Sequence, residues 1–128
     1  MSELADLWSD RLWYLSYEIL YFELENPLAQ DKCQIWENLI LIRAASPEEA
    51  YEKAMKHGFD SEDNVKIDGQ KGRCKFKGLK DLVRIYDDLE DGAELVWQEY
   101  ELEKNQLETS VKTKQDLHAF KPLPAEEE

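Results

Sequence analysis

The fold of this chain is decided by residues 12–24, LWYLSYEILYFEL, a stretch dense in aromatic side chains. In an extended strand, alternate residues point to opposite faces of a sheet. One face then carries Trp13, Leu15, Tyr17, Ile19 and Tyr21, and the other carries Tyr14, Ser16, Glu18, Leu20 and Phe22. Because both faces hold large rings, we predict a long strand in the interior of its sheet, with one face only partly covered.

Downstream, residues 25–32 have the composition of a turn and include Pro27, which cannot donate a hydrogen bond to a sheet. A second apolar run follows over residues 33–43 and also alternates. One side of it holds Trp36, Asn38, Ile40 and Ile42, and the other holds Ile35, Glu37, Leu39 and Leu41. We expect the two runs to pair as an antiparallel hairpin.

A helix start follows the second run at Ser46-Pro47-Glu48-Glu49. Ser46 can accept a hydrogen bond from a free amide, proline suits the first helical position, and Glu49 completes a capping box. The sequence predicts a helix over residues 47–57 that ends at Gly58. The apolar stripe that we expect to cover the sheet contains Ala50, Tyr51, Ala54 and Met55.

The second half of the chain reads as three more strands. A short strand over residues 65–67 and a glycine turn precede a return strand over residues 73–86, in which Gly78 indicates a bulge. Asp91-Gly92 then suits a tight turn into a last strand over residues 93–102. The order β-β-α-β-β-β predicts an α+β fold, an antiparallel sheet of about five strands with one principal helix on one face.

The chain of 128 residues has room for one ordinary domain. We assign residues 1–11 to a polar leader and residues 12–103 to a single α+β domain. Residues 104–128 lose the strand alternation and end in Pro and Glu, so we expect a flexible C-terminal tail.

Charge and cysteine usage limit the environment of the protein. Sixteen Lys and Arg against 29 Asp and Glu give a net charge of -13, which argues against duplex nucleic acid and leaves a basic partner open. The apolar stretches are interrupted by polar or charged residues, so we expect no membrane span and no signal peptide. Cys33 and Cys74 form no CxxC pair, and a cytoplasmic location fits them.

No catalytic signature stands out. Zinc binding needs several Cys or His residues at ligand spacing, whereas His57, His118, Cys33 and Cys74 are each isolated in the sequence. A helix end accounts for His57 without catalysis, and the acidic run over residues 87–91 lacks the spacing of a calcium loop. We therefore expect no catalytic residues, no metal and no cofactor.

One segment reverses the overall charge. Residues 66–80 hold six basic side chains and Asp68, a local net charge of +5. Arg73, Lys75 and Lys77 would share one face of a strand. This basic row is typical of a charged edge that prevents aggregation, the interpretation that we favour. A site for an acidic partner or for single-stranded nucleic acid is the alternative.

Several motifs together resemble a bacterial family of domains of unknown function, numbered 4288. The first is Trp13-Tyr14 at the start of the first strand. The second runs from Glu37 through residues 41–44 to Ser46-Pro47-Glu48-Glu49-Ala50, with Ala54 and Gly58 in the helix. The third contains Phe76-Lys77-Gly78, Asp81 and residues 89–95. The resemblance spans residues 12–102. It implies a small bacterial cytosolic domain and carries over no active site, because the family has no assigned reaction.

We favour a non-enzymatic interaction or regulatory module. One helix leaves a sheet face uncovered, which suits a protein partner or a homodimer, and the acidic chain favours a basic partner. The candidate interaction surface contains Tyr14, Tyr17, Tyr21, Trp36 and Trp97. One alternative is a ligand binder or enzyme with a pocket between helix and sheet, built from Tyr51, His57 and acids of the last hairpin. Single-stranded nucleic acid on the basic row is the other alternative.

Overall fold

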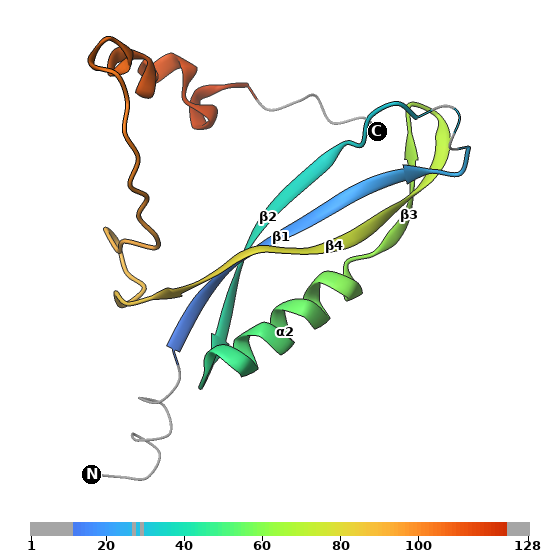
Figure 1. Cartoon of the computed structure of the whole chain (residues 1–128), viewed down its shortest axis with the longest axis horizontal. Coiled ribbons are helices and arrows are strands. Elements are labelled where there is room, and N and C mark those ends of the chain that lie inside the picture. The colour runs from blue at the N-terminus through green and yellow to red at the C-terminus, as the bar shows by residue number, and fades with distance from the viewer. Residues whose placement is uncertain (1–11, 27, 29, 123–128) are drawn as a thin grey trace. The chain divides into compact units, whose positions relative to one another are not determined.

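The structure, a computed structural model, describes residues 12–26, 28 and 30–122. It shows a four-stranded antiparallel sheet and one α-helix along one face (Figure 1). The strands are β1 (Leu12–Leu24), β2 (Ile35–Ala44), β3 (Asp63–Ile67) and β4 (Gln70–Ile85), and the helix is α2 (Pro47–Asp60). The order in the sheet is β2-β1-β4-β3. The α+β class is confirmed, with four strands in place of about five.

Strand β1 occupies the interior of the sheet, as its two aromatic faces predict, and its bounds match the predicted ones. It pairs with β2 without interruption from Leu12 to Tyr21, so the predicted hairpin is confirmed. Its pairing with β4 shifts register twice, on either side of Gly78. The shifts leave Lys77 and Lys80 without an opposite residue on β1. The bulge predicted at Gly78 is therefore present, and the φ of 143° at this residue suits a glycine.

Helix α2 begins as predicted, because the Ser46 hydroxyl accepts a hydrogen bond of 3.1 Å from the Glu49 amide. The prediction that Gly58 ends the helix is wrong. The helix continues to Asp60, and Gly58 lies buried against the ring of Phe76. A Cβ atom at this position would come within 2.4 Å of that ring. Gly58 therefore serves close packing between helix and sheet.

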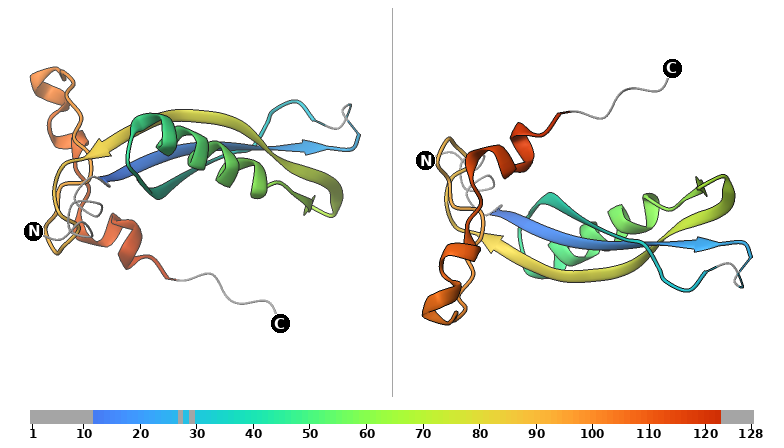
Figure 2. Two further views of the ribbon diagram at one scale, coloured as in Figure 1. Left: turned by 90° about the horizontal axis from the view of Figure 1, so that it is seen from below. Right: turned by 90° about the horizontal axis from the view of Figure 1, so that it is seen from above.

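Most of the hydrophobic core lies between α2 and the sheet, in two clusters, while Leu15 and Ile85 are buried on the opposite face. One contains Tyr14, Ile42, Ala44, Ala50 and Ala54, and the other contains Leu20, Phe22, Cys74 and Phe76. Ser16 and Glu18, both fully buried, separate them along β1. Figure 2 shows the helix along one face of the sheet, so the other face receives no cover from α2.

The predicted strand over residues 93–102 is wrong, because these residues form no ladder. The turn before it does form, since the Ala93 amide donates to the Glu90 carbonyl and the Glu94 amide donates to the Asp87 carboxylate. A strand is held in a sheet by hydrogen bonds to a neighbouring strand, and no strand of the sheet pairs with residues 93–102. The alternation of residues 93–102 is therefore not enough to make them a strand of the sheet.

The chain divides into two units, of which the first ends at Trp97 and the second begins at Gln98. The second unit holds short 3-10 helices at Lys104–Gln106, Glu108–Ser110, Lys114–Asp116 and His118–Phe120. The predicted leader over residues 1–11 lies outside the described residues. Flexibility of the tail stays a prediction. No helix in the described part of the chain has the length and apolar character to cross a membrane.

Candidate functional site

The face of the sheet opposite α2 carries an exposed apolar patch. The pairing of β1 with β2 sets Tyr17 beside Leu39 and Tyr21 beside Ile35. Ile35, Leu39 and Leu41 are 46% to 52% exposed, which is high for large apolar side chains on a sheet. We call this surface the open patch, and its members are Tyr17, Ile19, Tyr21, Ile35, Leu39 and Leu41.

Charged side chains near the open patch are paired with one another. Lys80 lies 2.9 Å from Glu37, and this hydrogen bond, together with the negative charge of Glu37, raises the pKa of Lys80. The Arg43 guanidinium lies over the ring of Trp13, at 5.5 Å from its centre. Glu37 faces Ile19 and Lys80 belongs to β4, so this ion pair crosses β1 within the open patch. It separates the Tyr21–Ile35 end of the patch from the end that holds Tyr17, Leu39 and Leu41.

The predicted interaction surface is only partly present. Tyr14 is 3% exposed and lies in the core under α2, so the prediction is wrong for this residue. Tyr17 and Tyr21 lie on the open patch. Trp36 is exposed but lies on the helix side of the sheet, where its ring packs edge-on against Phe22. Trp97 is 71% exposed in the segment that follows β4.

The residues that sequence reasoning missed are the aliphatic ones of the open patch, namely Ile19, Ile35, Leu39 and Leu41. The signal that points to them is the alternation of the second strand, once the hairpin register is known. The predicted surface contained only aromatic residues, so these aliphatic residues were left out.

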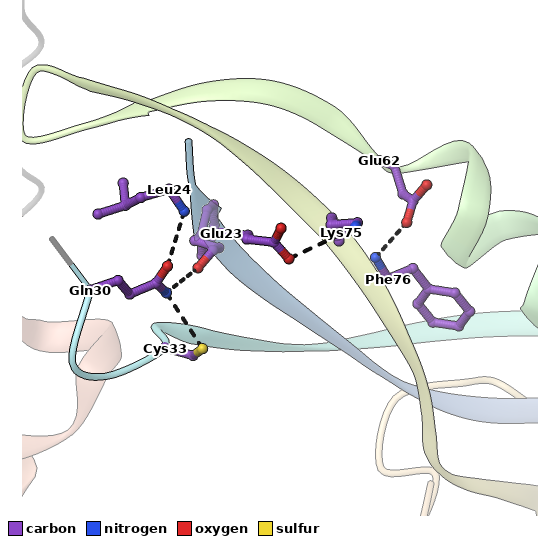
Figure 3. A network of polar contacts seen from close by, with 8 residues as sticks. Glu23, Leu24, Gln30, Cys33, Glu62, Lys75 and Phe76 are labelled. Carbon is purple, nitrogen blue, oxygen red and sulfur yellow. Dashed lines mark hydrogen bonds and ion pairs between the residues drawn. The ribbon is translucent and has the colours of Figure 1, made fainter. Parts of the chain in front are cut away.

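The predicted basic row is interrupted. Arg73 donates a hydrogen bond of 3.0 Å to Asn64, and Lys75 lies 3.8 Å from Glu23, a contact drawn in Figure 3. Lys77 falls in the bulge beside Gly78 and does not continue the row. The bulge is the physical reason, because it changes the direction in which the next side chain points.

A buried acid and a histidine form the most unusual polar contact of the described chain. Both carboxylate oxygens of Glu18, which is 0% exposed, lie 2.8 and 2.9 Å from Nδ1 of His57. The His57 ring is half-exposed. When Nδ1 carries the hydrogen, the carboxylate accepts it and holds the ring in one orientation. The contact joins the middle of β1 to the last turn of α2.

This pair differs from the pocket that the sequence suggested. His57 meets an acid of β1 and not the acids of the last hairpin. Tyr51 stands six residues before His57 on the helix, a spacing that points the two side chains in different directions. No group of three or more His, Cys, Asp or Glu residues that could hold a metal occurs within residues 12–122 as described.

A cavity of about 250 Å³ lies at the end of β4. Its lining includes the acids Asp87 and Glu94 and the aromatic residues Tyr86 and Trp97. Arg84 also lines it and stacks on the ring of Tyr86, at 4.7 Å from its centre. The lining therefore combines aromatic rings with two carboxylates, which is chemistry that suits basic side chains.

The two cysteines are free and differ in surroundings. Cys33 is exposed, and Figure 3 shows it beside Gln30, whose side-chain amide also hydrogen bonds the backbone of β1 at Phe22 and Leu24. Cys74 is buried in the core, and this burial, with the negative charges of Glu62 and Asp63, raises its pKa.

A thiol reagent such as Ellman's reagent is expected to modify Cys33 rapidly at neutral pH and Cys74 slowly, because the thiolate is the reactive form. Comparison of the wild type with Cys33→Ser separates the two rates. A fast reaction that persists in folded Cys33→Ser would contradict the buried position of Cys74.

Comparison with known proteins gives a family and nothing further. No curated protein and no solved structure matches the chain. The chain does match a family described as a domain of unknown function (DUF4288) over residues 13–97. The match covers β1 to β4 and α2 and ends where the first unit ends. The resemblance found from the motifs is confirmed, and the chain belongs to the DUF4288 family.

Proposed function

We propose that the protein is a non-enzymatic interaction module that binds a partner protein through the open patch. The supporting observation is the exposure of Ile35, Leu39 and Leu41 beside Tyr17 and Tyr21 on the face that α2 leaves uncovered. Soluble proteins rarely leave such adjoining apolar side chains in water unless a partner covers them. Tyrosines at the centre of a patch are frequent anchors of protein interfaces.

The charge of the chain supports a basic partner. Residues 81–103 contain nine acidic side chains and one basic one, Arg84. The cavity at the end of β4, with Asp87, Glu94 and Trp97 in its lining, suits a lysine or arginine of a partner. We therefore propose a basic protein with an apolar patch of its own, steered to this chain by opposite charge.

The exposed and unpaired Cys33 supports a reducing compartment. The family resemblance supports a bacterial source. We accordingly place this interaction in the bacterial cytoplasm.

The test has two stages. A partner is first captured from the host, identified and purified, and its dissociation constant with the full chain is then measured by calorimetry. Tyr17→Ala and Tyr21→Ala are each expected to weaken binding about tenfold or more, because each removes an aromatic ring from the open patch. Added salt should also weaken binding by slowing association.

Tyr51→Ala is the matched control, since it removes an exposed ring from the outer side of α2. It is expected to leave the dissociation constant unchanged. Equal affinity of the purified partner for the wild type, Tyr17→Ala and Tyr21→Ala would refute binding through the open patch.

A further inference from the structure

Strand β2 lies at an edge of the sheet, and its outward backbone groups can be identified. The Phe22 amide donates to the Gln34 carbonyl, so the even-numbered residues that continue into β2 direct their backbone groups toward β1. The odd-numbered residues direct theirs away from the sheet. Lys53 confirms this direction, because its amine lies 2.6 Å from the Arg43 carbonyl. Within the described residues, the outward groups of Glu37, Leu39 and Leu41 have no hydrogen-bond partner.

The other edges of the sheet are protected in ways that β2 is not. The free edge of β4 carries bulges at Lys77 and Lys80, and its Phe76 amide donates to the Glu62 carboxylate. Strand β3 has only five residues and contains Lys66. Bulges, lysines and short length are the devices that keep strand edges from pairing. Strand β2 has ten residues, contains neither Lys nor Pro, and pairs with β1 without a bulge.

The sequence of β2 complements itself. When two copies run antiparallel about a two-fold axis at Ile40, Leu39 of each copy faces Leu41 of the other. In the same register, Glu37 of each copy faces Arg43 of the other. Opposite charges face each other twice, and the outward backbone groups of Leu39 and Leu41 can exchange hydrogen bonds between the two copies. An axis at Glu37 would instead set the two Glu37 side chains face to face.

We infer that two copies of this chain pair edge to edge through β2 in the register centred on Ile40. The two sheets then form one continuous sheet, because antiparallel pairing adds strands in the same plane. Antiparallel pairing also keeps equivalent faces on the same side, so the two open patches become neighbours. The inference concerns the edge of the sheet, whereas the proposed function concerns its face, and each can fail without the other.

The test measures the mass of the full chain, 15.1 kDa as a monomer, by analytical ultracentrifugation at micromolar concentrations. The wild type is expected to dimerise. Glu37→Arg and Arg43→Glu each set like charges opposite one another and are expected to weaken the dimer about tenfold. The double variant Glu37→Arg with Arg43→Glu is expected to recover the dimer, which loss of local structure would not allow.

A second variant tests the edge itself. Leu39→Pro removes a backbone donor that points outward and leaves the ladder to β1 intact, so we expect a folded monomer. Ile40→Pro is the contrasting control and should disrupt the fold, because its amide serves that ladder. A monomeric wild type, a dimer insensitive to Leu39→Pro, or single variants that the double variant does not rescue would each overturn the inference. Binding of a partner by the monomer would leave the proposed function standing.

Discussion

Replacement of His57 by alanine is expected to lower the free energy of unfolding by about 3 kcal/mol. The reason is the carboxylate of Glu18, which has no solvent exposure and would lose its hydrogen-bond donor at Nδ1. Leaving a buried carboxylate without its hydrogen-bond donor typically costs about 3–5 kcal/mol. We expect the lower end of that range, because the half-exposed ring of His57 would leave space that water can enter. Urea denaturation followed by circular dichroism measures the change.

Two further variants test whether the contact between Glu18 and His57 causes this loss of stability. His118→Ala removes an exposed histidine from the second unit and is expected to change stability by less than about 0.5 kcal/mol. Glu18→Leu in the His57→Ala background removes the unpaired carboxylate and should recover most of the lost stability. A cost of His57→Ala no larger than that of His118→Ala would mean that the contact does not join α2 to β1 in solution.

Phe76→Ala is expected to destabilise the fold by about 3–5 kcal/mol, since it removes a large ring from the second core cluster. The ring is 6% exposed, fills the space beside Gly58 and packs edge-on against Phe59, with 5.1 Å between ring centres. The cavity left behind has little means of closing, because α2 and β4 hold it from both sides. Urea denaturation measures this loss. We expect a lower midpoint of unfolding and an unchanged slope of the unfolding free energy against urea concentration.

Phe120→Ala is the control for this prediction. The Phe120 ring is half-exposed in the second unit, and its removal should cost less than about 1 kcal/mol. Comparable losses for Phe76→Ala and Phe120→Ala would contradict the central position of Phe76 in the core.

Features encoded within a few neighbouring residues were predictable from the sequence. The bounds of β1 follow from alternation and from the proline at position 27 of the sequence, and the start of α2 follows from its cap at Ser46. Features that depend on distant packing were not. Gly58 reads as a helix end until the ring of Phe76 is known to lie against it. Residues 93–102 alternate like a strand but form no ladder with any strand of the sheet.

The same distinction between local and distant features applies to the candidate site. Alternation separated the two faces of β1 correctly but did not say which face α2 covers, and Tyr14 was misplaced for that reason. Glu18 was placed on the correct face of β1, but its partner His57 lies 39 residues away in sequence. Only the placement of the helix over the sheet brings the two together.

We propose that the open patch is a binding surface, exposed in the free monomer and covered in a complex. Hydroxyl-radical footprinting of the full chain, free at submicromolar concentration and bound to its purified partner, tests it most directly. We predict that Tyr17, Tyr21 and Leu41 react readily in the free chain, react slowly in the complex, and contrast with Tyr14, which stays protected in both. Protection of the open patch in the free monomer to the level of Tyr14, or reactivity unchanged by the partner, would contradict the claim.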